Sequence, residues 1–265
     1  MSPWWLVAGT AFILIGITKS GFGSGVGLMV VPMTIMAAPH LPSTGGVQHV
    51  LGLVLPLLIA GDIIAVGQYR RLFSPQVVKR LLPGTVIGIL IGGVLLWSMG
   101  KQRSELLASF IKIEVGLESV ILVGLHWYRT WRAGHEVKFH PSSIRSGAVG
   151  AFAGASSTLA HAAGPIIALH LLPQRMERQI FVGTCAVYFF LVNTAKLPIY
   201  RLSGQFHADT LLLSMKLLPL VFVGAGFGYW VTKRMNDRYF SRIVYALTFC
   251  LGWYLLWDGV VNLRR

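Results

Sequence analysis

The sequence Lys19-Ser20-Gly21-Phe22-Gly23-Ser24-Gly25-Val26-Gly27 interrupts the first apolar part of this chain, between the apolar runs Trp4–Ile17 and Leu28–Ala38. Glycines at alternate positions each weaken a helix by about 1 kcal/mol. We therefore expect a helix that breaks here and restarts near Gly25–Leu28. Non-helical backbone at membrane depth is tolerated only against protein or a water-filled cavity. In transporters the free N–H groups of such broken helices point at anionic substrates.

The composition is that of a polytopic membrane protein. Of the 265 residues, 54% are hydrophobic and only 12% are charged, against roughly 25% charged residues in soluble domains. Apolar runs of about 20 residues recur along the whole chain, and each is long enough to cross a bilayer as a helix. The net charge of +14 comes from Lys and Arg at the ends of these runs. That placement is typical of membrane anchoring rather than of nucleic-acid binding.

An all-α fold with about eight transmembrane segments in two homologous halves is predicted, and the first segment of each half is broken or re-entrant. Residues 1–128 form the first membrane repeat, residues 129–143 a polar connecting loop, and residues 144–265 the second repeat. The remaining full spans are predicted at Thr44–Gly67, Val77–Trp97, Glu105–His126, Gln179–Tyr200, Asp209–Val231 and Tyr239–Val261.

Two features of the second half match the first. The segment His161-Ala162-Ala163-Gly164-Pro165 separates the short apolar runs Ile144–Ala160 and Ala163–Leu172, which predicts a second interrupted segment. Leu82-Pro83, followed by Gly88 and Gly92, is repeated 136 residues later as Leu218-Pro219, followed by Gly224 and Gly228. Interrupted segments at matching positions of two repeats indicate a transporter binding site. The glycines four residues apart, from Gly84 to Gly92, also predict a close helix–helix contact.

The chain resembles the TauE/SafE family of sulfite and organosulfonate exporters. The resemblance rests on the Gly21–Pro32 segment, the helix after it, the motif Leu82-Pro83-Gly84-x3-Gly88 and the echo of these features in the second half, and it covers nearly the whole chain. It implies a secondary carrier of small sulfur-containing anions in a bacterial inner membrane. The second break is alanine-rich here, over Ala153–Ala163, where the family usually has more Gly and Ser, so the substrate stays open.

Both predicted breaks place polar side chains beside free backbone amides. Lys19 is interpreted as a cation that holds the anion; a lysine at the membrane surface is the alternative. Hydroxyl groups can donate to sulfonate oxygens, and a histidine can donate to an anion or hold a coupling proton. The predicted substrate-binding residues are Lys19, Gly21, Gly23, Ser24, Gly25, His49, Ser156, Ser157, Thr158 and His161.

Charged side chains inside the spans are candidates for coupling or ion pairing, because a charge deep in a bilayer costs roughly 3 kcal/mol and is usually paired. Asp62 and Lys196 lie 134 residues apart, and three interpretations stay open: a mutual ion pair, a proton or substrate relay, or positions near helix ends. Glu114 and Glu118 share a helix face and either hold a proton or face a basic neighbour such as Lys216. The candidates are Asp62, Glu114, Glu118, Asn193 and Lys196.

We expect a secondary transporter that moves sulfite, sulfoacetate or a related sulfonate across the cytoplasmic membrane by alternating access, as a multi-pass protein of the cell inner membrane. The expected partners are a small anion, membrane lipid and a coupling proton or cation; a homodimer is left open, and nucleic acid is not expected. A passive anion channel is the alternative. An intramembrane enzyme ranks below both, since the sequence contains no converging nucleophile, base or metal set and Gly21–Gly27 lacks the spacing of a nucleotide-binding loop. No catalytic residue, cofactor or metal ligand is predicted.

Overall fold

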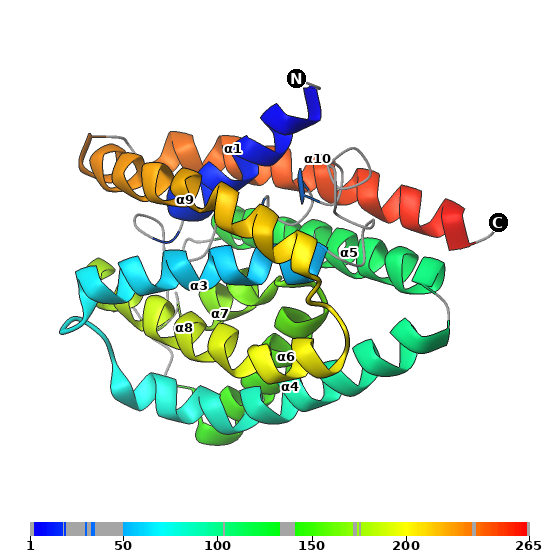
Figure 1. The fold of residues 1–265 in the computed structure, drawn as a ribbon. Helices are drawn as coiled ribbons and strands as arrows, with labels where there is room; N and C mark the ends of the chain where they lie inside the picture. The colour runs from blue at the N-terminus through cyan, green and yellow to red at the C-terminus, as the bar shows by residue number, and fades with distance from the viewer. Residues whose placement is uncertain are drawn as a thin grey trace.

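The fold is helical throughout the part of the chain that the computed structural model describes, which is residues 3–17, 19, 30, 33–34, 50–102, 104–132, 141–171, 174, 176–234 and 237–263. These residues contain no β-strand, which confirms the predicted all-α fold (Figure 1). The helices are α1 (Pro3–Ile17), α3 (Val50–Tyr69), α4 (Pro75–Gln102), α5 (Ser104–Arg132), α6 (Ser143–Ala160), α7 (Ala163–Leu171), α8 (Arg178–Leu202), α9 (Ala208–Arg234) and α10 (Asp237–Leu263).

Several of these helices can cross a membrane. By length and composition, the described residues contain four long apolar candidate spans, Val50–Tyr69, Pro75–Ser98, Gln179–Leu202 and Ala208–Phe227. The outward-facing positions of α4 hold large apolar side chains, including Val86, Ile87 and Val94, which are at least half exposed. Soluble helices place polar residues on such a face, whereas lipid contact requires apolar ones. The chain is therefore a polytopic membrane protein.

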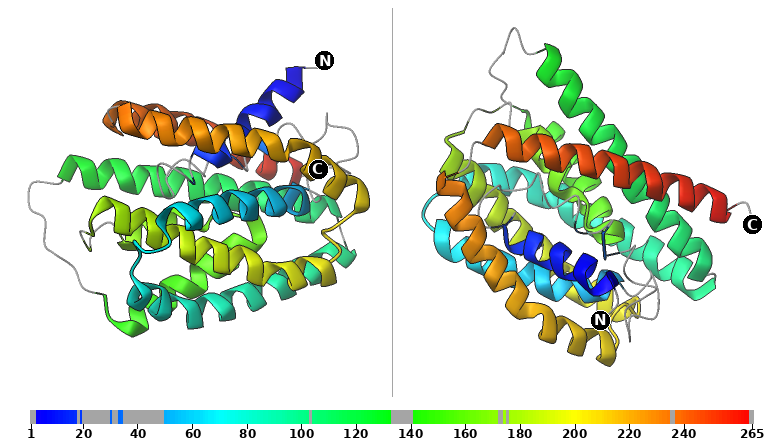
Figure 2. Two further views of the ribbon diagram at one scale, coloured as in Figure 1. Left: turned by 60° about the vertical axis from the view of Figure 1, so that its left-hand side comes forward. Right: turned by 90° about the horizontal axis from the view of Figure 1, so that it is seen from above.

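Six helices pack side by side in the order α1, α9, α3, α8, α4 and α6, so that α3 and α8 lie in the middle (Figure 1). The contacts are symmetrical about the central α3–α8 pair: α1 packs on α9 as α6 packs on α4, and α3 contacts α9 as α8 contacts α4. Helices α5 and α10 pack mainly against each other and lie to one side of this row (Figure 2, right). The middle pair α3 and α8 supplies the most buried charged side chains, Asp62 and Lys196.

Glycines allow the outer pairs to approach closely. A Cβ atom on Gly84 or Gly88 of α4 would collide with a carbonyl oxygen of α6, which confirms the predicted close contact of this helix face. In the same pair of helices, a Cβ on Gly154 of α6 would meet the α4 backbone. The other outer pair, α1 and α9, is equally close, because a Cβ on Gly16 of α1 would meet the α9 backbone. The division into repeats at residues 128 and 144 remains a prediction, and these paired contacts are compatible with it.

The second predicted interruption is present. Helix α6 begins after Ser142, whose Oγ accepts a hydrogen bond from the Arg145 N–H, and it ends at Ala160. His161 then adopts a left-handed conformation (φ 55°, ψ 22°), and α7 starts at Ala163. A side chain with Cβ is disfavoured in that conformation by about 1–2 kcal/mol, so the break is held by other contacts of His161. The first predicted break, Gly21–Gly27, lies outside the described residues.

The predicted ends of the third and fourth spans differ from the structure, since α4 continues past Trp97 to Gln102. We expected the fourth span to end at His126 and a polar loop to begin at residue 129, but α5 continues to Arg132. The added residues include aromatic side chains such as Trp127 and Tyr128, both more than two-fifths exposed. Aromatic and basic residues of this kind sit at the membrane interface while the helix continues through it. A loss of apolar character therefore marks the end of the lipid core and not the end of the helix.

Candidate functional site

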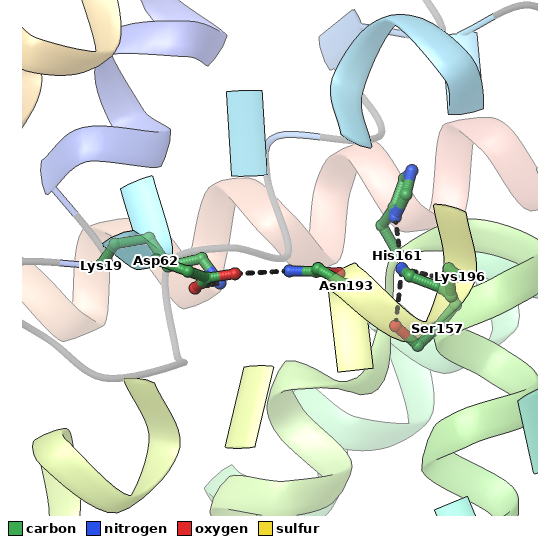
Figure 3. A network of polar contacts seen from close by, with 6 residues as sticks. All are labelled: Lys19, Asp62, Ser157, His161, Asn193 and Lys196. Carbon is green, nitrogen blue, oxygen red and sulfur yellow. Dashed lines mark hydrogen bonds and ion pairs between the residues drawn. The ribbon is translucent and has the colours of Figure 1, made fainter. Parts of the chain in front are cut away.

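The first part of a buried polar network joins the end of α1 to the middle helices. Lys19 lies two residues after α1, and its Nζ is 2.5 Å from Oδ1 of Asp62 on α3. The other carboxylate oxygen of Asp62 accepts a hydrogen bond of 2.6 Å from Nδ2 of Asn193 on α8. The Asp62 side chain is fully buried and that of Lys19 is 12% exposed. Three segments are thereby held together around one carboxylate, as Figure 3 shows.

The second part of the network surrounds Lys196, three residues after Asn193 on the same face of α8. Its Nζ donates to the carbonyl oxygen and to Oγ of Ser157, each at 3.0 Å, and to Nδ1 of His161 at 2.9 Å (Figure 3). Lys196 is fully buried. An ammonium group has three N–H donors, and all three point at the last turn of α6 and at the break that follows it.

The contacts of His161 fix its tautomer. Its Nε2 is 3.0 Å from the carbonyl oxygen of Leu51 on α3, which can only accept, so Nε2 has the proton and Nδ1 is the acceptor for Lys196. His161 therefore ties the α6–α7 break to both middle helices, which holds its left-handed backbone in place.

The charge of Lys196 has no carboxylate beside it. Within the described part of the chain the ion pairs are Lys19 with Asp62 and Lys112 with Asp258. All acceptors of Lys196 are neutral groups. A buried ion without a partner of opposite charge costs several kcal/mol, so this arrangement is well suited to a ligand that supplies the negative charge.

A comparison with protein families identifies the family of this chain. The family model described as sulfite exporter TauE/SafE matches residues 8–255, nearly the whole chain. The chain belongs to the TauE/SafE sulfite exporter family. No curated protein and no solved structure matches it. Family membership places the chain among membrane transporters of the sulfite-exporter type, and the matched range includes every residue of the network described above.

For this TauE/SafE chain, the structure brings together part of the predicted site. Lys19, Asp62, Ser157, His161, Asn193 and Lys196 belong to one network. Asp62 and Lys196 do not form the mutual ion pair that was one of the interpretations, since Asp62 pairs with Lys19. Both side chains are fully buried, and they lie about two turns before the ends of their helices, Asp62 in α3 (Val50–Tyr69) and Lys196 in α8 (Arg178–Leu202). The predicted site residues Gly21, Gly23, Ser24, Gly25 and His49 lie outside the described residues.

Two hydroxyl groups of α6 point away from the network. Thr158 donates its hydroxyl to the carbonyl of Gly154 in its own helix, at 2.8 Å. Ser156 donates to Oε1 of Glu118 on α5, at 2.5 Å. Three consecutive residues of a helix point in directions about 100° apart, so a single turn cannot aim all of them at one ligand. Of the predicted hydroxyl cluster, Ser157 is the member that contacts Lys196.

Glu114 and Glu118 of α5 were predicted either to hold a proton or to face a basic neighbour. Lys216, the example of a basic neighbour considered for Glu114 and Glu118, is exposed on α9, and among the described residues it forms no ion pair with either glutamate. Lys112 on α5 pairs with Asp258 on α10, with 2.6 Å between Nζ and Oδ2. Within the described residues, no group of three or more His, Cys, Asp or Glu is placed to hold a metal ion.

Sequence reasoning missed two aromatic residues of the site. Tyr200 is fully buried, donates its hydroxyl to the Thr158 carbonyl at 2.7 Å, and places its ring 5.7 Å from that of His161. Phe189 lies under Lys19, with Nζ 4.7 Å from the ring centre. Tyr200 is four residues after Lys196, and Phe189 is four residues before Asn193. The i, i+4 rule applied to α8 would therefore have found both.

Proposed function

We propose that this chain is a secondary transporter that binds a small sulfur-containing anion, such as sulfite, sulfoacetate or a related sulfonate, at the network around Lys196 and moves it across the cytoplasmic membrane by alternating access. The family supports the class of substrate. The position of the network supports the site, because it joins the break between α6 and α7 to α3 and α8.

The observation that carries this proposal is that Lys196 is buried without a carboxylate partner among the described residues. The side chain is fully buried and all its hydrogen-bond acceptors are neutral. Charged residues inside membrane proteins are costly and mark substrate pathways. An oxyanion near Lys196 offsets this cost, and the Ser157 hydroxyl, which accepts from Lys196, still has its own hydrogen to donate. Lys19 adds a second positive charge, which Asp62 largely neutralises.

The arrangement of helices also suits alternating access. Transporters built from matching halves move one bundle against another around a fixed central site. Here α3 and α8 lie in the middle of the row and hold Asp62, Asn193 and Lys196, while each contacts an outer pair, α1–α9 or α4–α6. Movement of an outer pair relative to the middle pair would open the network to one side of the membrane at a time.

The test is anion binding and transport by the purified protein in liposomes, with labelled sulfite and labelled sulfoacetate. Lys196→Met should weaken binding at least about tenfold, since opposite charges about 6 Å apart at an effective dielectric of about 20 attract each other by roughly 3 kcal/mol. Lys19→Ala should also weaken it. Lys216→Met, which changes an exposed lysine of α9, is the matched control and should bind normally. If neither anion binds or moves, and no other small anion competes, the assignment is wrong.

The same liposomes separate a carrier from a channel. A carrier exchanges labelled anion inside for unlabelled anion outside faster than it performs net transport, because the loaded site reorients in both directions. Stimulation of labelled efflux by unlabelled sulfite on the opposite side therefore supports alternating access. An efflux rate that does not depend on the anion on the opposite side, and that does not saturate with anion concentration, would indicate a passive pore.

A further inference from the structure

A second buried polar cluster lies beside the network and is not explained by anion binding. Glu114 and Glu118 lie four residues apart on one face of α5. Glu118 is 8% exposed, and its Oε1 accepts the hydrogen bond of 2.5 Å from Ser156 on α6. The Oε2 atoms of both glutamates are buried and have no hydrogen-bond partner among the described residues. Buried polar atoms are nearly always hydrogen-bonded, so two such atoms side by side call for an explanation.

No positive charge balances these carboxylates among the described residues. Lys112 is paired with Asp258 of α10, and neither glutamate forms an ion pair. Two like charges buried on one helix face repel each other and each also pays for desolvation. A proton on one carboxyl removes one charge and supplies an O–H donor for a neighbouring oxygen that lacks a partner.

The other titratable groups packed around α5 lie elsewhere or are already paired. From α8, Tyr200 is close enough to Glu114 to interact electrostatically, but its hydroxyl is donated to the Thr158 carbonyl. His170 of α7 contacts Ser146. Ser146 lies ten residues before Ser156 and is thus about 15 Å nearer the N-terminal end of α6. Lys196 on α8 and His161 after α6 are bonded to each other and to Ser157 and Leu51. The remaining charged side chains on these neighbours with described surroundings are Asp258 on α10, Arg145 at the start of α6, the exposed Arg201 near the end of α8, and the exposed Lys79 and Arg80 at the start of α4.

We propose that Glu114 and Glu118 together hold one exchangeable proton, and that this proton is the ion whose movement is coupled to that of the anion. This inference rests on the proposed transport function and names its coupling ion. The proton is taken from water on one side of the membrane, forms an O–H bond with a carboxylate oxygen of the pair, and returns to water on the other side. The site that binds the proton is therefore distinct from the site that binds the anion.

A short path joins the two sites. Ser156 donates to Glu118, and the next residue of the same helix turn, Ser157, accepts from Lys196. A change in the Glu118 contact shifts the last turn of α6, and this turn leads directly into the left-handed break at His161. Because α5 packs mainly against α10 and far less against α4, α6 and α7, this helix pair can also move relative to the row while the Ser156 contact opens or closes.

Infrared spectroscopy of the protein in liposomes tests the proton itself. Exposed carboxyl groups are ionised at neutral pH, so a C=O band of a protonated carboxyl at neutral pH reports a buried acid. The wild-type protein should show this band, the variant Glu114→Gln/Glu118→Gln should lack it, and sulfite should shift it. Asp258→Asn, which changes a carboxylate that has its own lysine, is the matched control and should keep the band. Absence of the band in the wild type, or its survival in the double variant, overturns the proposal.

Coupling is tested with the same preparations. The double variant should still bind sulfite but should lose the stimulation of sulfite transport that an imposed pH gradient produces in the wild type. If the double variant responds to the gradient as the wild type does, the pair is not the coupling site. If it is folded but binds no sulfite, the carboxylates belong to the anion site and the proposal is also wrong. A wild-type protein that shows the band but neither binds nor moves any anion contradicts the transport function instead, so the two failures are distinguishable.

Discussion

Lys19 and Asp62 form an ion pair at 2.5 Å, and under the predicted division into two repeats the equivalent contact is that of Ser157 with Lys196, whose one charged side chain comes from α8. The α1–α9 and α6–α4 contacts correspond when Gly16 is matched with Gly154, 138 residues later. The same offset matches Lys19 with Ser157, and the offset of 134 matches Asp62 with Lys196. Ser157 and Lys196 are indeed in contact. Asp62 neutralises Lys19 in the first contact. In the second contact Lys196 takes the place of the carboxylate and meets the neutral Ser157. We therefore place the anion beside Lys196.

The Lys19–Asp62 pair should behave as a unit when it is mutated. Asp62→Asn leaves Lys19 without its counter-charge and should destabilise the protein by about 3 kcal/mol, since removal of one partner of a buried pair is strongly destabilising. Lys19→Met should do the same to Asp62. The double variant should lose clearly less than the sum of the two. Thermal unfolding in detergent measures this, and strict additivity of the two single losses would show that the pair does not interact in the native state.

The sequence was sufficient to predict the helices and the second break, because both depend on residues close together in the chain. Apolar runs bounded by Pro, Gly and charged residues determine each span, and the short runs on either side of His161 indicate the interruption. Which partner Asp62 takes could not be predicted in this way. That choice depends on which face of α3 meets α1 and α8, and Gly61 of α3 contributes to it, because a Cβ atom there would lie only 3.2 Å from Cγ of Lys19 and 3.3 Å from Cγ2 of Ile15.

The effect of the left-handed backbone at His161 on stability can be separated from the effect of its ring contacts. His161→Gly and His161→Ala both remove the contacts with Lys196 and Leu51. Glycine adopts φ near 55° freely, whereas alanine is strained there by about 1–2 kcal/mol. The glycine variant should therefore unfold at a higher temperature than the alanine variant. In an ordinary helix alanine is the more stable of the two, so an alanine variant with the higher midpoint would mean that the break is not present in the membrane.

The close approach of α4 and α6 predicts a strong dependence on side-chain size. A Cβ on Gly88 would collide with the backbone carbonyl of Ala151, which cannot move without the whole helix. Gly88→Ala should therefore lower the unfolding midpoint although alanine favours helices. Gly226→Ala on α9 is the matched control, because a Cβ there meets no atom within 4 Å, and it should be neutral or slightly stabilising. Equal midpoints for the two variants would contradict the packing of α4 on α6.

Ser157 should affect affinity more than stability, since its hydroxyl accepts from Lys196 and is the donor that we assign to the proposed anion. Ser157→Ala removes one donor to the anion, and a hydrogen bond contributes about 0.5–1.5 kcal/mol, or roughly a twofold to tenfold loss of affinity for sulfite. Ser214→Ala removes another buried hydroxyl, which donates to the Leu53 carbonyl at 2.7 Å and to its own helix, so it should lower stability without changing affinity. Equilibrium binding and thermal unfolding of both variants separate the two effects. A Ser157→Ala protein with unchanged affinity would place the anion away from the last turn of α6.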